Sequence, residues 1–277
     1  MKLLWAALSA VALLYAATAP LTAAAQTLIV SDRESKKSLT RQDLLSRPAL
    51  RTITIADPVY HRSMTYRAVP AADVLQGMKI ADDDDVQARA MDNFSVGIPA
   101  RLLTATGAAV PEAFVAVEDT AAPWPPLPNH PEKAGAGPFF LIWRLAPSIQ
   151  ISSEYWVYRL AALAVTDGSL KRWPSLAVGP EVPAGDPVRT GVERYVELCI
   201  ACHRFKGAGE GDKGPDLGRP MNPVEYYQIP ALKKFIRDPA SVRQWPDQKM
   251  TGFNASTLSD ADLDAIIAWL AYKARQR

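Results

Sequence analysis

The stretch Cys199-Ile200-Ala201-Cys202-His203 decides how the C-terminal part of this chain is interpreted. It holds both cysteines of the 277-residue sequence, separated by two residues and followed directly by a histidine. A disulfide across so short a loop stabilises a fold very little, and two cysteines cannot build a disulfide framework. We therefore expect the two thiols to serve a cofactor or a reaction rather than to brace the fold.

Two thiols about one helical turn apart, with a histidine next to them, form the pattern for covalent attachment of a c-type haem. Each thiol can add to one vinyl group of haem, and the imidazole can then bind the iron through Nε2. Cys199 and Cys202 are thus predicted to hold one haem c, with His203 as an axial iron ligand. The alternative is a redox-active Cys-x-x-Cys pair, although no thioredoxin-like βαβ pattern surrounds the motif.

The composition excludes several classes of protein. The chain is 48% hydrophobic, with a mean hydropathy of −0.06 and a formal net charge of +2. These values exclude a disordered, a collagen-like and a multi-pass membrane protein. The near-neutral charge argues against nucleic acid as a partner, because phosphate contacts need an excess of basic residues.

Residues 1–25 have the pattern of a secretory signal peptide. Met1-Lys2 precedes the apolar run Leu3–Ala19, and Ala23-Ala24-Ala25 supplies small residues for cleavage before Gln26. The apolar run is shorter than the ~20 residues of a membrane-spanning helix. We expect an exported protein, most simply in a bacterial periplasm, with a membrane anchor as the alternative if the segment is not cleaved.

A proline-rich segment, 171–186, divides the remaining chain into residues 26–170 and 187–277. Because proline fixes φ and lacks an N–H donor, this segment is predicted to be an extended linker. The part after it is predicted to be all-α. Helices are expected over Val188–Leu198, over Ala231–Arg237, and after Ser259, which can cap the last helix.

The part before the linker is predicted to be mixed α+β and mostly strand. Short helices are expected after Thr40 and near Pro70, and Asp82–Asp85 is expected to be an acidic surface turn. Loop Trp124–Pro128 is either a contact surface or a cover packed on its own domain. Strands are predicted from β-branched and aromatic runs over 51–56, 94–98, 113–117, 139–143 and 155–165.

With these features in place, residues 187–277 resemble the class I cytochromes c. Gly191 and Tyr195 stand where that family carries a glycine and an aromatic residue in its first helix. The resemblance implies that they pack this helix against the last one, around Trp269 and Tyr272.

The same resemblance assigns further residues around the haem. Gly214-Pro215-Asp216-Leu217 resembles the loop after the haem motif, and it implies that the Pro215 carbonyl accepts the Nδ1–H of His203. Candidates for hydrogen bonds near the haem propionates are Tyr227, Arg237 and Trp245.

The resemblance also places a methionine ligand just before the terminal helix. Met250 in Gln248–Phe253 is the predicted sixth ligand, although Thr251 follows it where the family usually has proline. Met221 is the rival, but it follows the histidine-supporting loop too closely to cross the haem. A thioether ligand raises the reduction potential relative to a second imidazole.

Residues 27–168 more faintly resemble domains with the pterin-binding fold of sulfite-oxidase-type molybdenum enzymes. The resemblance rests on Tyr66–Leu75, Met91–Pro99, Gly137–Trp143 and Tyr155–Tyr158, which hold mostly structural residues. Those enzymes hold molybdenum through a cysteine thiolate, and residues 26–170 contain no cysteine. We therefore expect no thiolate-ligated molybdenum.

Together these observations predict a periplasmic mono-haem electron carrier with no catalytic residues of its own. Its partners would be redox proteins such as a periplasmic dehydrogenase, an oxidase or another cytochrome. The first alternative is an oxidoreductase, or its cytochrome subunit, whose N-terminal domain binds a substrate or pterin and passes electrons to the haem. The second is a haem-based ligand sensor, which needs an open or labile sixth position.

Overall fold

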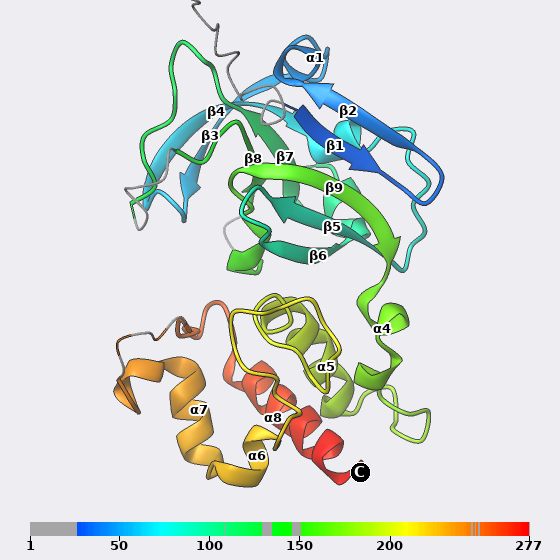
Figure 1. Cartoon of the computed structure of the whole chain (residues 1–277), viewed down its shortest axis with the longest axis vertical. Coiled ribbons are helices and arrows are strands. Elements are labelled where there is room, and N and C mark those ends of the chain that lie inside the picture. Colours follow the sequence, from blue (N-terminus) through cyan, green and yellow to red (C-terminus); the bar gives the residue numbers. More distant parts are fainter. Residues whose placement is uncertain are drawn as a thin grey trace, which may run out of the picture.

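The computed structural model describes residues 27–107, 109–128, 135–145, 151–244, 246, 248 and 250–276, so the predicted signal peptide lies outside the described residues. Within them a mostly-β part precedes a helical part (Figure 1). The strands are β1 (Thr27–Ser31), β2 (Lys36–Thr40), β3 (Arg51–Asp57), β4 (Arg62–Pro70), β5 (Asp84–Ala90), β6 (Ser95–Pro99), β7 (Glu112–Val117), β8 (Phe139–Arg144) and β9 (Leu160–Asp167). The α-helices are α1 (Arg41–Leu45), α2 (Ala71–Val74), α3 (Ala100–Thr104), α4 (Ser169–Arg172), α5 (Pro187–Leu198), α6 (Pro223–Tyr226), α7 (Ile229–Arg237) and α8 (Asp260–Arg275).

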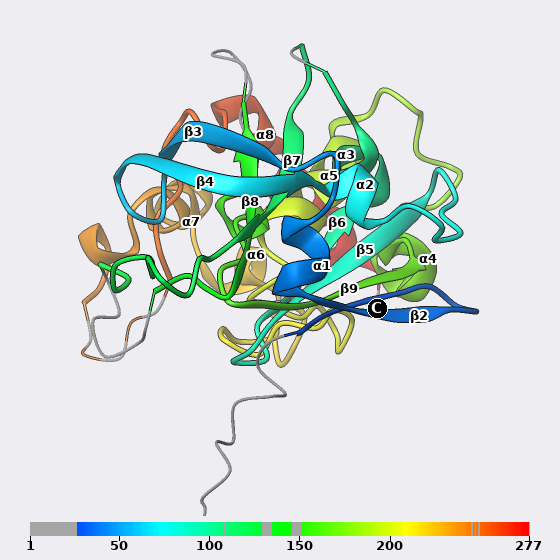
Figure 2. The same ribbon diagram turned by 90° about the horizontal axis from the view of Figure 1, so that it is seen from above.

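The N-terminal part contains two sheets. One has the strand order β2-β1-β9-β5-β6 and the other β3-β4-β7-β8. β1 runs parallel to β9, and the other strand pairs are antiparallel. The β3–β4 hairpin extends to one side of this part, while β2 lies at the other (Figure 2). β6 ends the first sheet and is its strand nearest to α5 (Figure 1).

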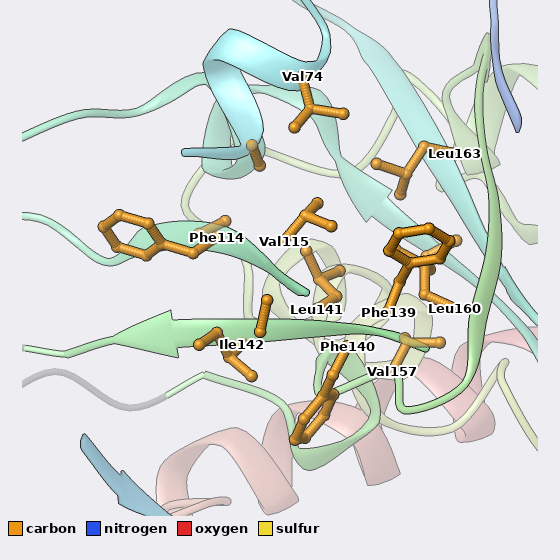
Figure 3. Close-up of a cluster of buried hydrophobic side chains, with 14 of the residues drawn as sticks. Val74, Phe114, Val115, Phe139, Phe140, Leu141, Ile142, Val157, Leu160 and Leu163 are labelled. Carbon is orange, nitrogen blue, oxygen red and sulfur yellow. The ribbon is translucent and has the colours of Figure 1, made fainter. Parts of the chain in front are cut away.

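The N-terminal core lies between these sheets. β7 and β8 are buried almost throughout, as expected for strands covered on both faces. Their side chains meet residues of α2, β9 and the segment before β9 (Figure 3). The labelled members of this cluster are Val74, Phe114, Val115, Phe139, Phe140, Leu141, Ile142, Val157, Leu160 and Leu163.

Most of the predicted elements of this part are present. The Thr40 side chain caps α1 and forms a capping box with Asp43, and α2 follows Pro70. The strand predicted over 155–165 begins only at Leu160, because Arg159 has a φ of +53° that interrupts an extended run. The residues before it form a 3-10 helix, η2 (Ser153–Tyr155), and a turn. β1, β2, β4, β5 and α3 were not among the predicted elements.

The expectation of an acidic surface turn at Asp82–Asp85 is wrong for its second half. Asp84 and Asp85 begin β5 and are 3% and 7% exposed. Arg33 donates to Asp84 at 2.6 Å, and Ser169 donates to Asp85 through its backbone N–H at 2.7 Å. Buried carboxylates need such partners, so these two serve the fold of the first sheet.

The helical part is organised by the contact of α5 with α8. A Cβ on Gly191 would lie 2.0 Å from the Ala265 carbonyl oxygen, so only glycine allows this approach. One turn further on, the Tyr195 ring packs against Trp269 with 4.4 Å between ring centroids. Both contacts agree with the expected packing of the first helix on the last. No helix in the described ranges is long and apolar enough to cross a membrane.

The proline-rich segment is not the extended linker that its composition predicts. It contains the end of α4 and a 3-10 helix, η3 (Pro174–Leu176), and Leu176 is fully buried in the C-terminal core. The Leu176 carbonyl accepts from Trp269 Nε1 at 3.2 Å, and the Ala177 carbonyl accepts from Lys273 Nζ at 2.6 Å. The segment is therefore packed on α8, because its few apolar residues and carbonyls find partners there.

Candidate haem-attachment site

The two cysteines and the histidine lie on one turn at the end of α5. Asp186 caps the start of this helix by accepting from the Val188 N–H at 2.9 Å, and Cys199 ends it. The backbone N–H groups of Cys202 and His203 then donate to the Cys199 carbonyl at 3.1 and 2.8 Å. The turn thus continues through the motif and holds all three side chains together, as the spacing predicts.

The imidazole of His203 is fixed from two directions. Its Nδ1 lies 2.8 Å from the carbonyl oxygen of Pro215, which can only accept, so Nδ1 carries the proton and Nε2 keeps its lone pair. The ring packs closely against Gly214, where an added Cβ would lie 2.2 Å from Cε1. Burial lowers the pKa of His203 and favours the neutral form that binds metals. The Pro215 contact implied by the family resemblance is present.

The loop after the motif is held by Asp216, a residue to which the sequence analysis gave no role. Its carboxylate accepts from the backbone N–H groups of Lys206, Gly207 and Gly218 at 2.7, 2.7 and 2.8 Å. This pattern closes the loop and thereby positions the Pro215 carbonyl beside it. The only local sign in the sequence is an aspartate in a glycine-rich loop, where such side chains commonly bind backbone N–H groups.

Burial disfavours ionisation of both thiols. Neither cysteine is in a disulfide. Burial raises the pKa of Cys199 to about 12 and that of Cys202 to about 11. Thiol–disulfide oxidoreductases lower the pKa of their attacking thiol, which keeps it ionised. In this protein the pKa values of both thiols are raised instead. The observation favours covalent attachment over the redox-active Cys-x-x-Cys alternative.

The two candidate methionines occupy different loops. Met250 is partly buried in the segment before α8, whereas Met221 is 47% exposed. The segment after Met250 is tied to α7, because the Phe253 N–H donates to the Ile236 carbonyl at 3.1 Å. Within the described part of the chain, no hydrogen bond or ring contact joins Met250 to the turn of His203.

The three candidates for the propionate surroundings differ in their contacts. Tyr227 stacks on Phe235 with 5.7 Å between ring centroids. Arg237 donates to the carbonyls of Phe253 and Leu258 and to the Asp260 carboxylate, so its guanidinium holds the loop before α8. Trp245 lies outside the described residues.

The N-terminal part has a charged cavity and an aromatic, proline-containing loop, Trp124–Pro128, but neither is a cofactor site comparable to the haem-attachment turn. A cavity of about 260 Å³ is lined largely by charged side chains, and its Arg33 is already bound to Asp84 and Asp167. Trp124 packs edge-on against Tyr66, and Leu127 is buried. The loop Trp124–Pro128 therefore covers its own domain. Across the described residues, no group of three or more His, Cys, Asp or Glu side chains is arranged to hold a metal ion.

A search of curated proteins finds no match to this chain. The family model of cytochrome c matches residues 188–273, from the first turn of α5 to the last turn of α8. Because this range contains the Cys199–His203 turn, its supporting loop and the α5–α8 contact, we conclude that the C-terminal part of the chain is a cytochrome c domain.

Proposed function

We propose that this protein is a periplasmic mono-haem electron carrier. The carrying observation is the turn on which Cys199, Cys202 and His203 lie together, with His203 Nδ1 bound to the Pro215 carbonyl. A bound haem iron supplies one-electron chemistry by cycling between its ferrous and ferric states. One attachment motif in the sequence implies one haem for each chain.

The residues present fit a haem. Two reduced thiols can form the thioethers, and the Nε2 lone pair of His203 is free to bind iron. Several apolar side chains after the motif pack on the C-terminal core but are only partly buried. A bound haem could remove their remaining apolar surface from water. These side chains are Leu217, Val224, Tyr227, Ile236 and Phe253.

Met250 is the proposed second axial ligand. Its partly buried place before α8 and the exposure of Met221 support this choice. With both axial positions filled, the iron would exchange electrons with redox proteins without binding a substrate. The signal-like residues 1–25 support export to the periplasm, where covalent haem attachment takes place.

We propose that the N-terminal part has a fold like the pterin-binding fold of sulfite-oxidase-type enzymes and that it binds no molybdenum. The two sheets are compatible with that resemblance, and residues 26–170 lack a cysteine for molybdenum. Its role would be to serve complex assembly and partner recognition rather than a reaction.

Spectra and metal analysis of the exported protein test the proposal. We expect sharp α and β absorption bands after reduction, about one iron per chain, and no stoichiometric molybdenum or pterin. Replacing both cysteines, Cys199→Ala with Cys202→Ala, is expected to abolish covalent attachment, measured as haem that acidified acetone extracts from the variant but not from the parent. Stoichiometric molybdenum or pterin would instead support an oxidoreductase, and carbon monoxide binding to the ferrous form would support a ligand sensor.

Replacing Met250→Ala is expected to abolish the weak ferric absorption band near the red end of the spectrum, because that band arises from the thioether–iron pair. The reduction potential should fall as well, since the thioether is lost. Met221→Ala is the matched control and should leave both quantities unchanged. The reverse pattern would assign the ligand to Met221.

A further inference from the structure

The outer face of the haem-attachment turn is covered by the N-terminal part of the same chain. Ile200 and Ala201, the two residues between the cysteines, are 5% and 6% exposed. Ile200 belongs to the C-terminal core, but Ala201 belongs to the N-terminal core. The turn is therefore packed from both sides.

Strand β6 supplies the opposing surface. It ends its sheet, so one side of its backbone lacks a neighbouring strand, and such an edge is normally protected from pairing with other chains. Ser95, Val96 and Gly97 of β6 border a cavity of only about 10 Å³ shared with Ile200 and Ala201. A space that small holds at most about one water molecule, so the two surfaces are closely packed.

A polar cluster closes the same interface. Glu210, in the loop after the motif, accepts from Arg172 Nη1 at 2.5 Å and from the Gln87 amide of β5. Arg172 Nη2 also lies 3.3 Å from Gln87 Oε1. The guanidinium stacks on Trp173 at 4.2 Å from the ring centroid, and Trp173 packs on the C-terminal core.

Gly97 makes room for this cluster. A Cβ there would lie 3.2 Å from Arg172 Nη2 and 3.3 Å from the Asp85 carboxylate. Residues from β5, β6 and α4 thus lie against the turn and the loop that follows it.

We propose that the N-terminal domain is a built-in cover for the haem-attachment turn, held closed by the Glu210–Arg172–Gln87 cluster around Ala201. The inference rests on the proposed function insofar as the covered turn carries haem. The domain would keep water and external redox proteins from this side of the cofactor, so electrons would enter and leave elsewhere. This assigns the N-terminal domain a task that needs neither a metal nor a substrate.

Hydrogen exchange of the holoprotein tests the cover. In Glu210→Ala, which removes the shared acceptor, backbone amides within 95–97 and 200–211 should exchange about tenfold faster, since hydrogen bonds to charged groups stabilise strongly. Ala201→Leu, which overfills the contact without changing charge, should act in the same direction. Glu193→Ala, an exposed carboxylate on α5, is the control and should leave these amides unchanged.

The reduction potential gives a second readout. Opening the cover in Ala201→Leu admits water, which favours the more highly charged ferric state, so the midpoint potential should fall. Unchanged exchange in both interface variants, with the amides of α8 and β8 still protected, would overturn the proposal. The haem absorbance of the same protein reports on the proposed function separately, because a chain that does not attach haem would lack this absorbance whatever its exchange rates.

Discussion

Replacing Gly214→Ala should displace the His203 ring and disrupt its contact with Pro215. The added Cβ would lie 2.2 Å from Cε1 and 2.6 Å from Nδ1 of the imidazole, far inside van der Waals contact. The ring cannot keep its 2.8 Å contact with the Pro215 carbonyl and also clear this methyl group. We expect a loss of about 1–3 kcal/mol in the free energy of unfolding, as overfilled sites show.

The haem spectrum should report the same displacement. A tilted imidazole directs its Nε2 lone pair away from the place set by the supporting loop, and histidine orientation tunes ligand strength. The ferric spectrum of Gly214→Ala should therefore shift toward weaker axial ligation. Gly185→Ala is the control, because nothing lies within 4 Å of a Cβ at that position. Equal spectra and equal stability for the two variants would contradict a supporting role for Gly214.

The sequence could predict the helical part well because its signals are local. Ser259 caps α8, and its Oγ accepts from the Asp262 N–H at 3.1 Å. Leu263, Ile266 and Leu270 fall on the buried face at helical spacing. The haem turn is equally local, since its three chemical groups lie within five residues.

The parts that could not be predicted depend on distant partners. The strand β5 contains adjacent carboxylates, which suggest a solvated turn until Arg33 and Ser169 are seen to reach them. Likewise the prolines of 171–186 suggest a free linker, because nothing local shows that Leu176 is buried. In such cases tertiary contacts override local propensity.

The same distinction applies to the candidate site. The Pro215 contact of His203 followed from the family resemblance, whereas the three backbone hydrogen bonds of Asp216 did not. The pairing of Glu210 with Arg172 joins residues 38 positions apart in the sequence. A glutamate and an arginine are common at surface positions, so the sequence alone gives no sign that Glu210 and Arg172 pair. The Glu210–Arg172–Gln87 cluster becomes apparent only in the folded chain.

Trp269→Ala should be the most destabilising of these substitutions in the cytochrome c domain. The indole is fully buried, and its ring lies 4.4 Å from Tyr195 and 4.9 Å from Phe205 between centroids. Truncation would leave a large cavity at the α5–α8 contact, which costs about 3–5 kcal/mol for a buried aromatic residue. It would also leave the Leu176 carbonyl without its indole donor.

Urea unfolding followed by circular dichroism measures this loss without depending on tryptophan fluorescence. Trp269→Phe keeps most of the aromatic packing but cannot donate to Leu176, so it should lose about 1 kcal/mol for that hydrogen bond and somewhat more for its smaller ring. Tyr226→Ala removes an aromatic ring that is 56% exposed, and it should cost about 0.5 kcal/mol or less. If Trp269→Ala were no more costly than Tyr226→Ala, the helical core would not depend on the α5–α8 contact. The loss in the free energy of unfolding should therefore be largest for Trp269→Ala, smaller for Trp269→Phe and smallest for Tyr226→Ala. The α5–α8 contact matters for the site because the haem-attachment turn continues directly from α5.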